Sequence, residues 1–209
     1  MLSVITHTRH TNLAWLKKCE ESVAAALPDG AVHKILPAYD DWAKKRLDAV
    51  YDNEFIAFVD DDDWIDPNSL KLCLDAITST NVGIAFTNEV SVRADESIIQ
   101  RHNYSREYTF VRILPRTIHH LSVIRSSAVD PRCLELHNKF GVGIDWFIRA
   151  SAALVHDAIH VPMDGYYWRT YPESTTSKTH QHYCKSMDEM CYAIEDTWGF
   201  RNGSIPIYQ

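Results

Sequence analysis

The sequence predicts an α/β fold in which a mostly parallel central sheet is flanked by helices. Apolar, strand-like runs alternate with segments of helical periodicity through the first 80 residues, as in consecutive β-α-β units. Residues 55–59 are continuously apolar and bounded by polar residues, which is typical of an inner strand covered on both faces. Four consecutive aspartates, residues 60–63, follow this run at its carboxyl end, where open α/β sheets bind ligands.

The chain begins with a predicted β-α-β unit. Residues 2–6 form its first strand, and a helix capped by Thr11 or Asn12 follows a polar turn. The apolar residues on one face of this helix are Leu16, Val23, Ala24 and Leu27. After a break that contains proline and glycine, residues 32–36 form the second strand, which ends at Pro37.

Two further helices are predicted on either side of the aspartates. Residues 42–50 are expected to be helical because apolar side chains recur at helical spacing, at Ala43, Leu47 and Val50. After the aspartates, Asp66 and Pro67 have the form of a helix N-cap and first helical residue. The apolar stripe of this helix consists of Leu70, Cys73, Leu74 and Ile77.

The pattern becomes less regular beyond residue 80. Strands are predicted over residues 83–92, 108–114 and 119–124, with a polar segment between the first two. Helices are predicted over residues 144–155 and 182–198, where apolar side chains again recur at helical spacing. We expect all 209 residues to form a single domain.

The composition restricts the partners and the compartment. The formal net charge of −7 disfavours a protein that binds nucleic acid nonspecifically over a broad face. The five cysteines are an odd number without C-x-x-C spacing, which is typical of reduced thiols in a cytosol. No apolar run approaches the roughly 18 residues of a membrane span. We therefore expect a cytoplasmic protein with no integral membrane segment.

The four aspartates indicate a bound cation. Two like charges about 4 Å apart repel by roughly 4 kcal/mol at an effective dielectric constant near 20, and a run of four increases this cost. In an extended chain Asp60 and Asp62 would share one face, with Asp61 and Asp63 on the other. Such pairs of carboxylates suit Mg²⁺ or Mn²⁺ that also binds substrate phosphates. The alternative is a solvated acidic turn that caps the next helix.

Three segments resemble glycosyltransferases of the GT-A fold, in particular the family 2 enzymes that use nucleotide-diphospho-sugars. Residues 55–67 resemble that family's strand ending in Asp-x-Asp-Asp, followed by an aromatic, an aliphatic and an acidic-Pro helix start. Residues 143–146 occur where the family has an acidic pair at a helix start, and residues 167–174 resemble its closing Tyr-Arg…Ser segment. The resemblance implies a GT-A-like, Rossmann-like sheet with a short antiparallel portion on the acceptor side. It also implies a nucleotide-sugar half (about 1–80), an acceptor and catalytic half (about 81–178) and a C-terminal helix and tail (179–209).

The resemblance also implies roles for individual residues. Asp60 and Asp62 would hold Mn²⁺ or Mg²⁺, and Asp145 would be the general base of an inverting transfer. The nucleotide-sugar would contact Thr6, Thr8, Arg9, Asp40, Asp41, Lys44, Asp60, Asp61 and Arg169. The chain departs from the family in two places: Ile144 replaces the Glu before Asp145, and the second strand is followed by Tyr39-Asp40-Asp41 in place of Asp-Asp-Gly-Ser.

The donor implied by the resemblance is a nucleotide-diphospho-sugar of the UDP or GDP type. The acceptor stays open among a glycan, a protein, a lipid-linked glycan and a modified nucleic-acid base. One alternative is a nucleotidyltransferase or another metal-phosphate enzyme, although the turn at residues 7–10 lacks the glycines of a phosphate-binding loop. The other is a catalytically silent module of the same fold that binds a nucleotide or glycan.

Overall fold

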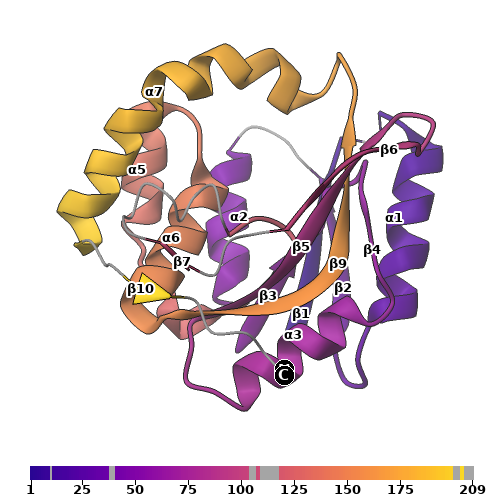
Figure 1. Cartoon of the computed structure of the whole chain (residues 1–209), viewed down its shortest axis with the longest axis horizontal. Coiled ribbons are helices and arrows are strands. Elements are labelled where there is room, and N and C mark those ends of the chain that lie inside the picture. Colours follow the sequence, from indigo (N-terminus) through magenta and orange to yellow (C-terminus); the bar gives the residue numbers. More distant parts are fainter. Residues whose placement is uncertain (10, 38–40, 104–106, 109–117, 200–202, 205–209) are drawn as a thin grey trace.

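The computed structural model describes residues 1–9, 11–37, 41–103, 107–108, 118–199 and 203–204 (Figure 1). The strands are β1 (Leu2–Thr8), β2 (Val32–Pro37), β3 (Phe55–Phe58), β4 (Trp64–Ile65), β5 (Ile84–Arg93), β6 (Ile98–His102), β7 (Glu107–Tyr108), β8 (Ser122–Arg125), β9 (Ala158–Thr170) and β10 (Gly203–Ser204). The helices are α1 (Leu13–Ala26), α2 (Trp42–Val50), α3 (Ser69–Thr78), α5 (Cys133–Phe140), α6 (Ile144–His156) and α7 (Thr175–Trp198), with a short 3₁₀ turn at Ser126–Ala128.

The central sheet is mixed. Its strand order is β2-β1-β3-β8-β5-β9-β4, and β6 pairs with β5 outside this path. Strand β1 pairs in parallel with β2 and β3, and β5 pairs in parallel with β9. The antiparallel pairings involve β8, β6 and β4. Parallel pairing therefore occurs in two places, at β2-β1-β3 and at β5-β9, and β3 is an inner strand whose carboxyl end carries the aspartates.

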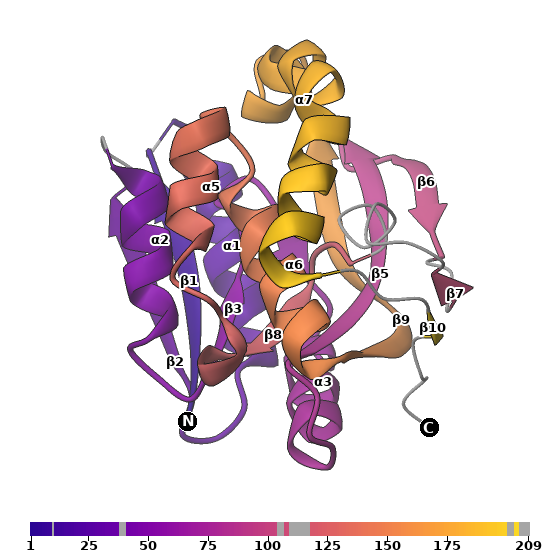
Figure 2. The ribbon, with the colours of Figure 1, turned by 90° about the vertical axis from the view of Figure 1, so that its left-hand side faces the viewer.

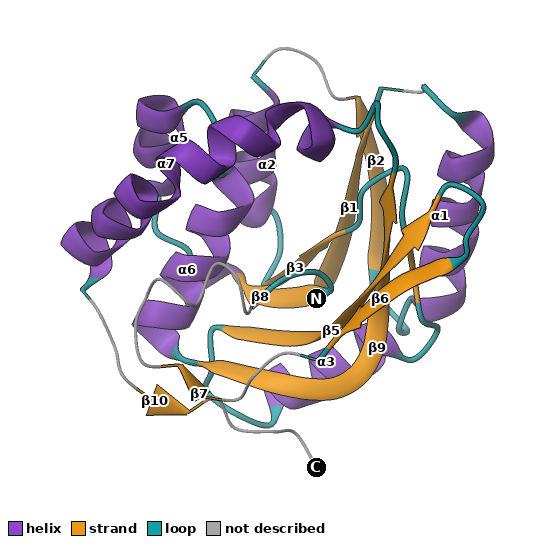
Figure 3. Ribbon diagram, turned by 45° about the horizontal axis from the view of Figure 1, so that its top comes forward, coloured by secondary structure: helices purple, strands orange, loops and turns teal. Residues whose placement is uncertain are grey.

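Helices cover both faces of the sheet (Figures 1 and 3). Helices α1 and α3 pack on one face, and α2, α5 and α6 pack on the other. Helix α7 lies along the outer side of α5 and α6 (Figure 2). Because successive side chains of a strand point to opposite faces, β3 supplies Ile56 and Phe58 to one apolar core and Phe55 and Ala57 to the other.

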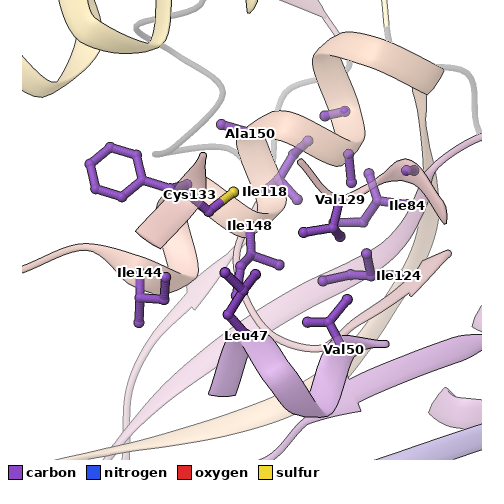
Figure 4. Close-up of a cluster of buried hydrophobic side chains, with 14 of the residues drawn as sticks. Leu47, Val50, Ile84, Ile118, Ile124, Val129, Cys133, Ile144, Ile148 and Ala150 are labelled. Atoms are coloured by element: carbon purple, nitrogen blue, oxygen red, sulfur yellow. The ribbon is translucent and has the colours of Figure 1, made fainter. Parts of the chain in front are cut away.

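The core beneath α2 and α6 supports the helices that carry two of the site residues. Figure 4 shows Leu47 and Val50 of α2 in one cluster with Ile148 of α6 and Ile124 of β8. Burying one such side chain contributes about 1.5–3 kcal/mol. These contacts fix α2 and α6 against the sheet.

Several helix predictions are confirmed, with shifts at some ends. Helix α2 has the predicted bounds, and Asn12 caps α1 by accepting hydrogen bonds from two backbone N–H groups. In contrast to the prediction, Ala24 of α1 is exposed. Helix α3 begins at Ser69, later than predicted, after a turn in which Asp66 Oδ1 accepts from the backbone N–H of Asn68 over 2.8 Å, as an N-cap side chain does.

The second half of the chain differs more from the prediction. Residues 93–107 contain β6, an exposed strand without apolar alternation. The strand predicted over 119–124 is the shorter β8, and most of the one predicted over 108–114 lies outside the described residues. Helix α7 begins several residues earlier than predicted. Among the helices described, none is both long and apolar enough to cross a membrane.

Candidate active site

The four aspartates form a tight turn, which we call the aspartate turn (residues 60–63). The backbone N–H of Asp63 donates to the carbonyl oxygen of Asp60 over 3.1 Å, so the chain reverses after β3. The chain is therefore not extended here, and the alternation of side chains expected for an extended chain does not apply. Asp60, Asp61 and Asp62 are partly exposed, whereas Asp63 is buried at 2% exposure.

Asp63 anchors the turn to β9. Its carboxylate accepts hydrogen bonds from Tyr166 Oη and from the backbone N–H of Arg169, each 2.7 Å long. Tyr166 Oη in turn accepts from the backbone N–H of Asp60 over 3.2 Å. Burial, followed by the charges of Asp62 and Asp60, raises the pKa of Asp63 well above its usual range. Asp63 thus fixes the turn, while the other three carboxylates remain partly exposed.

Asp61 joins the turn to the end of β1. Thr8 Oγ1 donates to Asp61 Oδ2 over 2.6 Å, and the backbone N–H of Arg9 donates to the same oxygen over 3.3 Å. Thr6 does not share this position. It is fully buried, and its hydroxyl lies 3.0 Å from His33 Nε2. The structure therefore brings Thr8, Arg9 and Asp61 together but places Thr6 in the interior.

Asp62 is held by a residue that the sequence analysis missed. Tyr171 Oη, just after β9, donates to Asp62 Oδ2 over 2.8 Å. Burial, followed by the charge of Asp60, raises the pKa of Asp62 to about 6, although this hydrogen bond lowers it. The raised pKa therefore reflects the burial of Asp62 first and its repulsion by Asp60 second.

Asp60 and Asp145 meet at a buried arginine. Arg46 of α2 is 3% exposed, with Nε 2.6 Å from Asp145 Oδ1 and Nη1 3.3 Å from Asp60 Oδ1. Its guanidinium carbon lies 4.2 Å from the ring centre of Phe58. Burial alone would lower the pKa of Arg46, but the two carboxylates raise it above the usual value. Likewise, burial would raise the pKa of Asp60, but Arg46 keeps it below the usual value.

Asp145 lies in the first turn of α6, as the sequence predicted. The preceding Gly143 has a φ of +86°, a conformation that glycine adopts without strain, and a Cβ there would lie 2.4 Å from Met190 Cε. The side chain of Asp145 is 27% exposed, with Oδ1 turned inward to Arg46. The predicted base therefore lies beside the aspartate turn and remains partly open to solvent.

Arg169 is enclosed by protein. Its guanidinium donates to the carbonyl oxygens of Asp62 and Ala94 over 2.8 and 3.0 Å, and it lies between the rings of Trp15 and Trp64 at 4.7 and 4.9 Å. At 1% exposure it offers no surface to a diphosphate in this structure. Its contact with the donor stays a prediction that this geometry does not favour.

The other predicted donor ligands lie at the surface or outside the described residues. Lys44 is exposed and pairs with Asp48 over 2.5 Å on α2. Asp41 is exposed at the start of α2 in a left-handed conformation, with a φ of 65°. Asp40 lies outside the described residues. Among the described residues, neither Lys44 nor Asp41 has a side-chain hydrogen bond or ion pair with the aspartate turn.

The carboxylates suit a hard divalent cation that is shared with a substrate. Asp60, Asp61 and Asp62 offer only oxygen atoms, which is the ligand chemistry of Mg²⁺ and Mn²⁺. Within the described part of the chain, no three His, Cys, Asp or Glu side chains are grouped to hold a metal by themselves. A cation at this turn would therefore need further oxygen ligands, which substrate phosphates and water would supply.

Solved structures of S. aureus TarS, a GT-A-type glycosyltransferase, resemble the chain in fold. TarS 1–349 aligns with a TM-score of 0.57 and 16% identity over 90% of this chain and 65% of that one. Its complex with UDP-GlcNAc aligns with a TM-score of 0.60 and 17% identity, over 84% of this chain and 60% of that one. Its complex with UDP aligns with a TM-score of 0.58 and 16% identity, over 92% of this chain and 70% of that one. The chain thus spans less than two thirds of the first two structures. The likeness confirms the GT-A-like α/β fold.

No protein-family model matches the sequence, and no curated protein matches it.

Proposed function

We propose that this chain is a glycosyltransferase that moves a sugar from a nucleoside diphosphate to an acceptor hydroxyl with the help of Mn²⁺ or Mg²⁺. The observation that carries the proposal is the meeting of Asp60 and Asp145 at Arg46. Residues far apart in the sequence thereby come together, with Asp60, the proposed cation ligand, beside the partly exposed Asp145 at the carboxyl end of β3. The TarS fragment of similar fold has been solved with UDP-GlcNAc and with UDP, which supports a UDP-type donor.

Asp60 and Asp62 would hold the cation, which neutralises the charge that develops on the departing diphosphate. Asp61 positions the end of β1 through Thr8 and the backbone of Arg9. Asp145 would accept the proton of the acceptor hydroxyl during an in-line displacement, which inverts the configuration of the sugar. The described cysteine thiols are free and buried, which supports the cytoplasmic location expected from the sequence.

Donor turnover tests this function. The protein would be incubated with Mn²⁺ and UDP-, GDP-, dTDP- or CDP-sugars, with and without candidate acceptors, and free nucleoside diphosphate would be measured. We expect release that depends on Mn²⁺ and on one class of donor. Release only of nucleoside monophosphate or inorganic phosphate would favour a different metal-phosphate enzyme.

A catalytically silent binding module is the second candidate. The observation that favours it is the ion pair between Asp145 Oδ1 and Arg46. A carboxylate with a purely structural role would make the same ion pair. Donor binding without release of nucleoside diphosphate, across all donors and acceptors, would support this candidate.

A further inference from the structure

Arg46 is a single cation shared by two carboxylates of the site. Within the described residues, the ion pairs of Asp60 and of Asp145 are both with Arg46. The nearby His7 does not add a charge at neutral pH, because burial and then the charge of Arg46 lower its pKa to about 4. One positive charge therefore faces two negative charges at this point of the site.

Arg46 lies close to both carboxylates, but two of its nitrogen atoms lack a hydrogen-bond partner. Its Nε and Nη2 atoms are buried without a hydrogen-bond partner, and so is Asp145 Oδ1. Besides the two ion pairs, the guanidinium is held by the ring of Phe58 and by one long hydrogen bond, in which Nη1 donates to Asp60 Oδ1 over 3.3 Å. Moving the charge of Arg46 from Asp60 to Asp145 alone would therefore break only one long hydrogen bond, the one to Asp60.

We propose that Arg46 is a built-in counterion of the cation site: it neutralises Asp60 when no divalent cation is bound, competes with the cation for Asp60, and pairs with Asp145 alone once the cation binds. The inference rests on the proposed function and adds a link between cation binding and the base. Arg46 acts through the two carboxylates and is a positioning residue. When the donor complex is assembled, the positive charge of Arg46 therefore acts on Asp145 alone.

The direction of this competition distinguishes the counterion from a merely structural arginine. Without Arg46, Asp60 keeps its full negative charge and attracts a divalent cation more strongly. Without Asp145, the charge of Arg46 acts on Asp60 alone and weakens cation binding. A structural arginine would leave cation affinity unchanged, or its loss would weaken it by disturbing the site.

The first test is calorimetric titration of Mn²⁺ in the presence of UDP. We expect Arg46→Met to bind Mn²⁺ about tenfold more tightly than the wild type, which corresponds to about 1.4 kcal/mol. Lys71→Met removes the same charge from the exposed face of α3 and should match the wild type. Unchanged or weaker affinity in Arg46→Met would overturn the proposal. If that variant does not fold, Asp145→Asn should bind Mn²⁺ about tenfold more weakly, and unchanged affinity would overturn it.

The second test needs no metal. Urea unfolding is measured for Asp145→Asn in the wild type and, separately, in the Arg46→Met chain. The urea midpoint should fall in the wild type, where Arg46 loses a partner, and rise in the Arg46→Met chain, where an uncompensated carboxylate is removed. Equal shifts in the two backgrounds would contradict a shared counterion. If the wild type takes up no Mn²⁺ with UDP, the proposed function fails, while this comparison still decides whether the charges of Arg46 and Asp145 are coupled.

Discussion

Asp62 and Asp145 are expected to affect different steps. Asp62→Asn removes the charge of a proposed cation ligand but keeps the acceptor for Tyr171 Oη, so the turn should persist while Mn²⁺-dependent UDP binding is lost. Asp145→Asn should still bind the donor at saturating Mn²⁺ and turn over at least about 10²-fold more slowly. Calorimetry and steady-state kinetics on both variants measure the two effects. Equal loss of donor affinity in both would exclude Asp145 as the base.

Replacing Arg169 distinguishes a structural role of this residue from a role in binding the diphosphate. Arg169→Lys keeps the charge but cannot bond to the carbonyl oxygens of Asp62 and Ala94 in the same geometry. We expect it to lower the free energy of unfolding by about 1–3 kcal/mol, measured in urea without ligand. If Arg169 instead binds the diphosphate, stability will stay near the wild-type value and the KM for the donor will rise.

At the scale of elements, Asp130 joins the start of α5 to the end of α7. Its carboxylate accepts from the backbone and guanidinium of Arg132 and, over 2.9 Å, from Trp198 Nε1. The hydrogen bond with the Arg132 side chain is the main cause that lowers the pKa of Asp130 to about 2. Because the folded-state pKa is depressed, the carboxylate stabilises the fold above its unfolded pKa of about 3.9 and loses this effect as pH falls towards 2.

The corresponding variant is Asp130→Asn. It should lower the free energy of unfolding by about 1 kcal/mol at neutral pH and by progressively less as the pH falls from about 4 to 2. Urea unfolding at several pH values measures this. Asp75→Asn on α3, which removes an exposed i,i+4 partner of Lys71, is the control and should change stability by no more than about 0.5 kcal/mol. A loss that does not vary over this pH range would exclude the ionised carboxylate as its cause.

The elements that the sequence predicted well are those with a strong apolar period. Helix α2 has its predicted bounds because its apolar positions recur at i, i+4 and i+7. Arg46 lies at i+3 of the same stripe, between Ala43 and Leu47, and this position was the available signal for its burial. The burial of Arg46 was missed because a charged residue on a helix was expected to face solvent. Strand β6 was missed because an exposed edge strand needs no apolar alternation.

The aspartate turn shows a second limit of sequence patterns. Four identical side chains cannot be assigned separate roles by residue type. The difference arises from Tyr166, which lies 103 residues from Asp63 and binds it only after β9 has joined the sheet. The sequence therefore predicted a carboxylate site at the end of β3 but not that Asp63 would be its structural anchor.

At the scale of the whole molecule, strand pairing joins the two predicted halves. Strand β8 pairs with β3, so that residues from the second half lie against an inner strand of the first. Strand β4 follows the aspartate turn and pairs with β9 through Trp64 and Tyr167, whose rings stack at 5.2 Å. Residues 1–80 alone would therefore leave β3 and β4 without these partners.

A single cooperative unfolding transition is expected from this arrangement. Because each half completes the sheet of the other, neither should unfold first, and the described cores on both faces of β3 should be lost together. Urea unfolding followed by tryptophan fluorescence and by far-UV circular dichroism should give coincident midpoints. An isolated fragment of residues 1–80 should lack a cooperative transition. Two separated transitions, or cooperative unfolding of that fragment, would show that the N-terminal half is an independent domain and that the aspartate turn does not need β9.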